Sequence, residues 1–244
     1  MSVNDSRFNV IKINAYANPN QTAYIALHND YSEDPISWQL DEIPSEEKCG
    51  EIVVSRLLKG DRGHYGCLEH AHITFSCEHF PHSVIVQART HRVGCTFDVQ
   101  SQRYTGKRVL DLVAGKLKTQ DVFYCRPIGF YHDRQGHKYY YSEEMREEAL
   151  YNMLLTATAY AKEIRAGVAE EQARDLLSQG IRQNFVVTFN SRSLCHFFDL
   201  RSKADAQPEI IALCERLKPY FCEWMPQVAE WYMSNRWGKA RLSP

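Results

Sequence analysis

Three short segments of this sequence concentrate arginine, histidine and amide side chains, which are groups that proteins use to hold an anionic, hydrogen-bonding ligand. They cover residues 64–72, 87–104 and 190–201, and Arg174 precedes the last of them. A guanidinium group binds phosphate through paired hydrogen bonds, and nearby hydroxyl and amide groups orient the ligand. The chain therefore carries the residue types for recognising a phosphorylated compound, provided that the fold brings them together.

The first segment, 64–72, reads His-Tyr-Gly-Cys-Leu-Glu-His-Ala-His. Its histidines and Glu69 are candidate metal ligands, but the spacing contains neither the His-Glu-x-x-His pattern nor the paired cysteines of zinc sites. If the segment leads into a strand, His70 and His72 share one face of it. The alternative is that these histidines are structural or exposed, and we predict no metal site.

The second segment, 87–104, combines arginines with a histidine, a serine and a carboxylate. Residues 87–92 are expected to close a helix, whereas residues 93–102 show neither a helical nor a strand period. A turn-rich stretch of this composition suits an anionic ligand. Taken alone, however, it is better explained as a solvated basic loop.

The third segment belongs to a predicted helix. Arg192 and His196 are four residues apart and therefore share a face, and Arg201 lies further along. Neighbouring phenylalanine and leucine residues indicate that the helix is partly buried, so its polar groups need a protein or ligand partner. The alternative is a set of internal salt bridges to Asp199 and Asp205.

The surrounding pattern predicts a mixed α+β fold and one domain, 1–244, which is an ordinary size for a single core. The predicted strands are 8–13, 72–77, 122–125 and 185–189. The predicted helices are 46–59, 81–92, 142–167, 170–177, 192–201 and 208–231, the last broken near Pro219 or Pro226. Residues 17–44 are expected to be largely irregular. No regular βαβ alternation or glycine-rich fingerprint follows a strand, which argues against a Rossmann domain or a P-loop.

Bulk composition narrows the function classes. The formal net charge is -1, so no global basic field favours nucleic-acid binding. Apolar runs such as 84–86 are too short to span a bilayer, and residues 1–7 lack the apolar core of a signal peptide. None of the eight cysteines forms a Cys-x-x-Cys pair. We therefore expect a cytoplasmic protein with reduced thiols that binds neither membrane nor nucleic acid.

The three segments resemble the motifs of the flavin-dependent thymidylate synthases, whose signature is Arg-His-Arg-x-x-Ser-x-Asn-Glu-x-Ser-x-Arg-Tyr. Residues 91–92 and 101–104 match that signature, and residues 64–70 resemble the upstream His-x-x-x-x-Glu-His motif. Residues 190–207 resemble the stretch Asn-x-Arg-Ser-Leu…Leu-Arg…Ala-Gln, and Ala173-Arg174 matches another family position. These matches occur in the family's order over more than half of the chain.

The sequence also departs from the family pattern. Thr90 stands where the first signature arginine is usual, and Arg89 precedes it by one place. One extra residue separates His91-Arg92 from Ser101. Counting back from Ser101, Thr96 takes the place of the signature serine, Asp98 that of the asparagine and Val99 that of the glutamate, so Asp98 is the carboxylate nearest the lost glutamate. The remaining departures are Gln102 for a common glycine, His196 for a common asparagine and Asp205 for a common histidine. These changes put individual flavin contacts in question but leave the nucleotide-binding arginines in place.

The resemblance implies a homotetramer that methylates dUMP, with active sites built where subunits meet. It implies methylenetetrahydrofolate as the carbon donor and FAD, reduced by NADPH, as the hydride source. The residues implied to bind dUMP are Gln87, Ser101, Gln102, Arg103, Arg174 and Arg201. The residues implied to contact the cofactor are His64, His91, Arg92, Asp98, Asn190, Arg192 and His196. Arg201, at the uracil, and His64, near flavin and folate, are the implied catalytic residues, whereas Cys95 is not expected to act as a nucleophile.

Two alternatives remain. The departures from the signature are also compatible with a nucleotide-binding protein of the same fold that has lost catalysis. The aromatic run 137–141, close to Arg134, is compatible with base stacking by an RNA-binding protein. The near-neutral charge argues against RNA binding, and such tyrosines more often belong to a half-buried strand.

Overall fold

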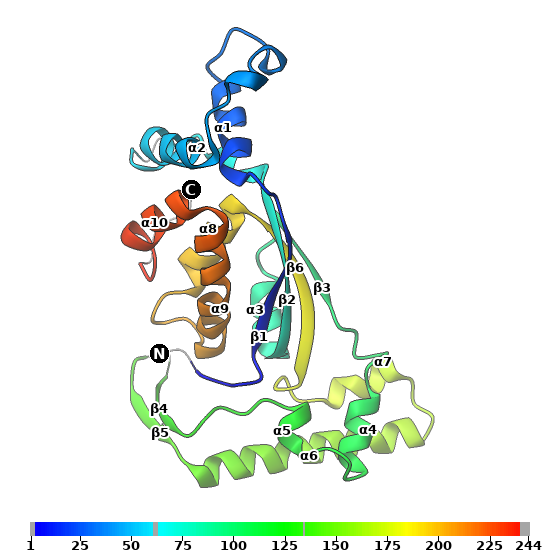
Figure 1. Ribbon diagram of the computed structural model, residues 1–244. Coiled ribbons are helices and arrows are strands. Elements are labelled where there is room, and N and C mark those ends of the chain that lie inside the picture. The colour runs from blue at the N-terminus through cyan, green and yellow to red at the C-terminus, as the bar shows by residue number, and fades with distance from the viewer. Residues whose placement is uncertain (1–2, 61–62, 134, 240–244) are drawn as a thin grey trace. The chain divides into compact units, whose positions relative to one another are not determined.

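The computed structural model describes residues 3–60, 63–133 and 135–239 and shows a mixed α+β fold, which confirms the predicted class (Figure 1). The strands are β1 Asn9–Ala15, β2 His72–Pro81, β3 Cys95–Val99, β4 Gly129–His132, β5 Lys138–Tyr141 and β6 Arg182–Asn190. The α-helices are α1 Pro19–Asn29, α2 Glu46–Val53, α3 His82–Ala88, α4 Lys107–Val113, α5 Thr119–Val122, α6 Glu143–Arg165, α7 Glu170–Ala173, α8 Ser191–Arg201, α9 Pro208–Trp224 and α10 Pro226–Asn235. The shorter helical turns are η1 Ile36–Trp38, η2 Leu40–Glu42, η3 Val54–Leu58, η4 Tyr65–Glu69 and η5 Arg174–Leu176, of which η3 is a π-helix.

Four strands form one sheet in the order β1-β2-β6-β3. The strands β4 and β5 form a separate antiparallel hairpin in which Gly129 lies opposite Tyr141. The aromatic run 137–141 thus falls largely on the strand β5, as the sequence favoured, but this strand is mostly exposed rather than half-buried. Arg134, which precedes the run, lies outside the described residues.

The chain divides into two compact units, which are described separately. Unit 1 comprises Met1–Asn9, Cys77–Thr90 and Asp98–Phe185. Unit 2 comprises Val10–Ser76, His91–Phe97 and Val186–Pro244. The substrate-binding residues predicted from the sequence fall in unit 1 apart from Arg201, and the predicted cofactor residues fall in unit 2 apart from Asp98.

Unit 1 is stabilised by an apolar cluster in which α4 and α5 pack on the long helix α6 (Figure 1). A buried ion pair supports the start of β6, where the Arg182 guanidinium is 2% exposed. It donates to the Asp5 carboxylate at 2.6 Å and to the carbonyls of His79 and Gln120, both at 3.0 Å. A buried cation is tolerated here because a carboxylate and carbonyl oxygens satisfy it.

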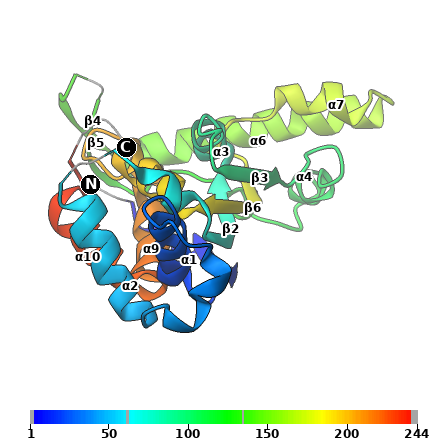
Figure 2. The ribbon, with the colours of Figure 1, turned by 90° about the horizontal axis from the view of Figure 1, so that it is seen from above.

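Unit 2 is organised around α8, whose last turns carry a buried polar group. Asp199 accepts hydrogen bonds from Tyr232 Oη and from Arg236 Nη2, both at 2.7 Å, and this ties α8 to α10 and the residue that follows it. In the same unit α1 and α2 lie side by side, and α10 contacts α2 (Figure 2). The helix that carries the predicted cofactor residues Arg192 and His196 is therefore fixed by internal contacts.

Most long elements lie where the sequence predicts them. Ser142 caps α6 by accepting a hydrogen bond from the Met145 amide at 3.3 Å, which explains why this helix starts where expected. The predicted helical region 208–231 is α9 followed by α10. Pro219 lies inside α9 without breaking it, and Pro226 begins α10.

Three local expectations were wrong. Residues 17–44 contain α1, because Pro19 occupies the first position of that helix, where no amide hydrogen bond is needed. Residues 93–102 contain the short strand β3, on which half-buried and exposed residues alternate. Residues 122–125 are not a strand, since α5 ends at Val122 and only Phe123 forms an isolated bridge, with Ile181.

Candidate functional site

Unit 1 contains an open pocket of about 650 Å³, here called the unit 1 pocket. Three of the residues predicted to bind a nucleotide line it, namely Ser101, Gln102 and Arg174. They lie far apart in the sequence, so their convergence is a property of the fold. Arg89 and His82 line the same pocket.

Backbone hydrogen bonds hold the walls of the unit 1 pocket. The amides of His82 and Ser83, at the start of α3, donate to the carbonyls of Ile181 and Gln179 at 2.9 and 3.1 Å. His82 Nδ1 lies 2.5 Å from Gln183 Oε1, and because that oxygen only accepts, Nδ1 carries the proton. Gln183 Nε2 in turn donates to the Gln100 carbonyl at 3.0 Å. The pocket wall is therefore fixed before any ligand arrives.

The charges of the unit 1 pocket suit an anion. Within the described part of the chain, neither Arg89 nor Arg174 makes an ion pair or a side-chain hydrogen bond. Asp175 also lines the pocket and is the one carboxylate among the lining residues that the structure describes. Two guanidinium groups beside a hydroxyl and amides form the donor set that a phosphate monoester requires.

Two other predicted substrate residues of unit 1 do not line this pocket. The Arg103 Nε lies 3.3 Å from a Glu171 carboxylate oxygen, and both side chains are about half exposed. The backbone carbonyl of Gln87, on α3, accepts a hydrogen bond from Thr90 Oγ1 at 2.8 Å. The structure thus supports Ser101, Gln102 and Arg174 as one group and leaves Arg103 and Gln87 outside it.

In unit 2, three predicted residues form a cluster, here called the unit 2 cluster, of His91, His196 and Arg201. Arg201 Nε donates to His91 Nε2 at 3.0 Å, and the two imidazole rings lie edge to face with centroids 5.1 Å apart. Burial, followed by the nearby positive charges, lowers the pKa of His91 to about 4. His91 is therefore neutral at physiological pH, with its single proton on Nδ1.

Two further predicted residues at the start of α8 take part in internal bonds. Asn190 is the N-cap of α8, since its side-chain Oδ1 accepts a hydrogen bond from the Ser193 backbone amide at 2.7 Å. The backbone amide of Asn190 donates to the Gly94 carbonyl at 2.8 Å. Gly94 has φ +66 and lies so close to Asn190 that a Cβ there would be 2.3 Å from its Nδ2. Arg192 Nη1 forms an ion pair with Glu69 at 2.5 Å. The segments 64–72, 91–97 and 190–201 are thereby brought together within unit 2.

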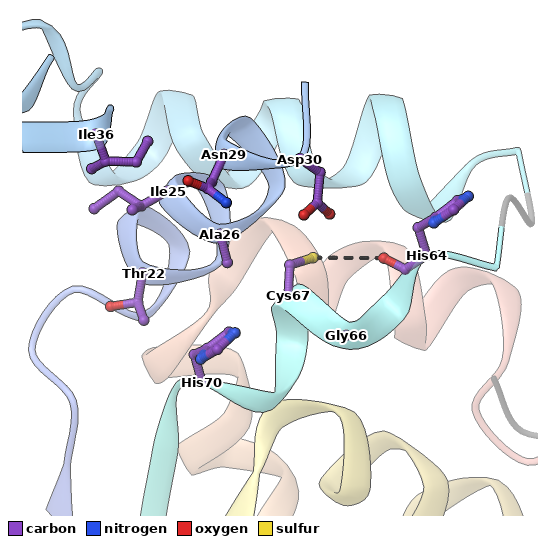
Figure 3. Close-up of a pocket in the computed structure, with 10 residues that line it drawn as sticks. All are labelled: Thr22, Ile25, Ala26, Asn29, Asp30, Ile36, His64, Gly66, Cys67 and His70. Carbon is purple, nitrogen blue, oxygen red and sulfur yellow. Dashed lines mark hydrogen bonds between the residues drawn. The ribbon is translucent and has the colours of Figure 1, made fainter. Parts of the chain in front are cut away.

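His64 lines a second pocket, of about 720 Å³, between α1, η1 and the turn η4 (Figure 3). Figure 3 shows His70, Cys67 and Asp30 around this pocket, with the His64 imidazole pointing away from Cys67. Burial and the charge of Asp30 raise the pKa of the Cys67 thiol to about 11. His64 itself is exposed, so its side chain is open to a ligand.

The last two predicted cofactor residues, Arg92 and Asp98, are exposed, and Asp98 lies on β3. Arg89, His82 and Gln183 line the unit 1 pocket but were not predicted. For Arg89 and His82 the signal was present, since they lie seven residues apart on a predicted helix and therefore share a face. Gln183 gave no such signal, because its position depends on how β6 packs.

The described residues offer neither a metal site nor a membrane-spanning helix. No group of three or more His, Cys, Asp or Glu side chains in residues 3–60, 63–133 and 135–239 is arranged to hold a metal ion. Among the same residues, no helix combines the length and the apolar character that crossing a bilayer demands.

The chain is similar in sequence to one protein family. The family model described as thymidylate synthase complementing protein matches residues 12–227. A flavin-dependent thymidylate synthase of Haloarcula marismortui is 32% identical, over 90% of this chain and 93% of that protein. One from Halobacterium salinarum is 30% identical, over 95% of this chain and 98% of that protein.

A solved structure shows the same fold. The UMP/dUMP methylase PolB from Streptomyces cacaoi, bound with 5-Br dUMP, superposes with a TM-score of 0.75 over 100% of both chains at 18% identity. The same methylase bound with 5-Br UMP gives a TM-score of 0.70. At this identity the likeness establishes the architecture.

Proposed function

Because this chain belongs to the thymidylate synthase complementing protein family, the flavin-dependent thymidylate synthases, we propose that it methylates dUMP to dTMP. The carbon comes from methylenetetrahydrofolate, and the hydride comes from FAD that NADPH has reduced. The chain is an enzyme of this family, so its residues must bind a nucleotide and a flavin. The observation that carries the proposal is the convergence of Ser101, Gln102 and Arg174 on one polar pocket.

The unit 1 pocket is the proposed site for the dUMP phosphate. Arg174 supplies a guanidinium with no competing ion pair among the described residues, and Ser101 supplies a hydroxyl. Gln102 adds an amide side chain where the family has glycine. Arg103 and Gln87 are proposed to contact the nucleotide from outside this pocket, which for Arg103 requires release of Glu171.

One feature of the unit 2 cluster fits a bound flavin, namely a buried hydrogen-bond donor that needs an acceptor. His91 Nδ1 is buried and has no hydrogen-bond partner among the described residues, although it carries the proton of the neutral ring. A buried N–H group without an acceptor is costly, and a carbonyl or phosphate oxygen of a ligand would satisfy it. The proposed cofactor residues are His64, His91, Arg92, Asp98, Asn190, Arg192 and His196.

When bound, reduced FAD supplies the hydride that completes the methyl group, and the chain's own residues provide position and charge. Arg201 is proposed to lie at the uracil ring, where its positive charge stabilises negative charge that develops during transfer. His91 accepts the Arg201 Nε hydrogen bond and therefore fixes the direction of the guanidinium. A neutral His91 does this without adding a competing positive charge.

The assembly and location of the enzyme are also proposed. We infer a homotetramer of single-domain chains, 1–244, in the cytoplasm, with each active site drawing residues from several copies. The support is the family resemblance. Sedimentation analysis of the purified protein tests it, and a fully active monomer would contradict it.

The direct test is dTMP formation from dUMP with FAD, NADPH and methylenetetrahydrofolate, leaving out each component in turn. Product that depends on every component is the expected result. The same assay is repeated with UMP in place of dUMP, because the solved structure with this fold is named a UMP/dUMP methylase. Methylation of UMP but not dUMP would replace the proposed substrate while keeping the reaction type.

The catalytically inactive alternative makes a different prediction. A nucleotide-binding protein of the same fold would bind dUMP but hold no flavin and form no product. Flavin absorbance in the purified protein, combined with dUMP titration, separates the two. The family membership and the donor left free at His91 Nδ1 both favour the enzyme.

A further inference from the structure

We propose that Arg89, which lies outside the matched family motifs, is a phosphate-binding residue of the unit 1 pocket. This inference rests on the proposed function. It adds a second guanidinium to the dUMP phosphate site, and its chemical target is a phosphate monoester dianion.

Helix geometry places Arg89 on the pocket side of α3. Arg89 caps the C-terminal end of α3 with φ -68 and ψ -4, and its amide donates to the Ile85 carbonyl at 2.9 Å. Seven residues are nearly two helical turns, so Arg89 lies about 20° around the helix from His82. Both side chains line the unit 1 pocket, as this direction requires.

Position 90 does not meet the same requirement. Residue 90 lies beyond the helix, because α3 ends at Ala88 and Arg89 is its C-cap, and Thr90 does not line the pocket. Its hydroxyl donates to the Gln87 carbonyl at 2.8 Å, which holds Thr90 against its own turn. In this chain the pocket-facing guanidinium therefore comes from position 89.

The charge balance of the pocket favours two arginines acting together. Among the described lining residues, Arg89 and Arg174 stand against a single carboxylate, Asp175, and none of the three makes an ion pair within the described chain. A phosphate monoester carries about two negative charges at neutral pH. One guanidinium would neutralise only part of that charge. Two guanidinium groups neutralise it more fully and, with the Ser101 hydroxyl, donate directed hydrogen bonds to the phosphate oxygens.

Among the described residues, neither Arg89 nor Arg174 has a structural ion-pair partner. Arg182, in the same unit, is 2% exposed and held by Asp5, which identifies it as structural. Arg89 is exposed and makes no such contact in the described chain. A cation kept at a pocket wall without a structural partner is the expected form of a ligand-binding residue.

The test compares Arg89→Gln with wild type in the flavin-loaded enzyme, using calorimetric titration with dUMP and with deoxyuridine, which lacks the phosphate. Because the variant loses the paired, charge-assisted hydrogen bonds of one guanidinium to the phosphate, we expect dUMP to bind about tenfold to a hundredfold more weakly. Deoxyuridine binding should stay within twofold of wild type. Arg89→Lys keeps the charge without the fork and should give an intermediate loss.

Two further variants make the result specific. Arg174→Gln is expected to show the same selective loss of dUMP binding. Arg165→Gln, which removes an exposed arginine at the end of α6 in the same unit, is expected to bind both ligands like wild type. Thermal melting of each variant separates weakened binding from unfolding, because a folding defect would affect dUMP and deoxyuridine alike.

Each outcome is decisive. Binding of dUMP by Arg89→Gln within twofold of wild type, while Arg174→Gln loses it, would overturn the role of Arg89 and leave the proposed function standing. Equal weakening of dUMP and deoxyuridine would also overturn it, because the phosphate would then not be the group recognised. A wild-type enzyme that binds no dUMP would instead refute the proposed function itself.

Discussion

The unit 1 pocket and the unit 2 cluster both contain arginines that the sequence singled out, but the two units treat them differently. In unit 1, Arg89 and Arg174 stand at an open pocket without ion pairs among the described residues. In unit 2, Arg201 donates to His91 and Arg192 is paired with Glu69. The unit 1 pocket keeps its two arginines available, whereas Arg201 and Arg192 of unit 2 are held by internal bonds.

This difference suggests different tasks. An unpaired guanidinium at a pocket contributes to the affinity for an anion, so its removal affects binding and spares folding. A guanidinium in a partly buried network is held in one direction, which suits a group that must meet charge as it develops during a reaction. Removing it affects both turnover and stability.

The strongest test of the comparison is Arg201→Ala. We expect turnover to fall by at least about a hundredfold, because a positive charge at the reacting ring is lost. Stability should fall by about 1–3 kcal/mol, since His91 Nε2 loses its internal donor. Steady-state dTMP formation and urea unfolding measure the two effects, with flavin absorbance showing that FAD stays bound. Turnover at the wild-type rate would remove the assignment of Arg201.

In unit 1 the matching variant is Arg174→Gln. We expect saturating turnover to stay within a few-fold of wild type, while the KM for dUMP rises by about tenfold to a hundredfold. The free energy of unfolding should change by less than about 0.5 kcal/mol, because the side chain has no ion pair to lose within the described residues. A large loss of stability with an unchanged KM would make Arg174 structural and abolish the contrast between the units.

A third test uses pH. The folded-state pKa of His91 is about 4, below the ordinary value of 6.5, so the unfolded chain binds more protons between these values. The contribution of neutral His91 is fully present above pH 6.5 and is lost as pH falls towards 4. It amounts to at most about 3 kcal/mol. Urea unfolding between pH 4.5 and 7.5 should show wild-type stability falling with acid, and His91→Gln should flatten that slope.

The control is His132→Gln, since His132 is exposed on β4. It should keep the wild-type slope. The nearby His196, whose pKa is also lowered chiefly by burial, contributes in the same direction and leaves part of the slope in His91→Gln. A slope unchanged in His91→Gln would show that the ring is not held neutral in the folded protein.

Much of the fold was available from local sequence signals. Ser142 at the start of α6 and Ser45 at the start of α2 are side-chain caps, and both cap hydrogen bonds form. The strand β3 was missed because five residues at the sheet edge carry too short a period to recognise. The helix α1 was missed because Pro19 was read as part of a loop, although proline also favours the first turn of a helix.

The candidate site was predictable in residue type but only partly in position. Motifs marked Ser101 and Arg174, and the fold places both at one pocket. They also marked Asn190 as a cofactor residue, yet its Oδ1 caps α8, a role that asparagine just before a predicted helix also signals. The pairing of Arg103 with Glu171 and of Arg192 with Glu69 joins residues far apart in the sequence. Such contacts depend on tertiary packing and leave no local signal.

The smallest expected effect concerns Cys95, which lies next to the unit 2 cluster. Its Sγ donates to the His91 carbonyl at 3.1 Å, and burial raises the pKa of the thiol, against the opposing effect of Arg92. A cysteine nucleophile needs the opposite, a thiolate stabilised by lowering of its pKa. Cys95→Ala should therefore retain turnover within about twofold and lose less than about 1.5 kcal/mol of stability, the worth of one weak hydrogen bond. Complete loss of dTMP formation by a folded, flavin-bound Cys95→Ala protein would mean that the unit 2 cluster performs covalent chemistry as well as positioning.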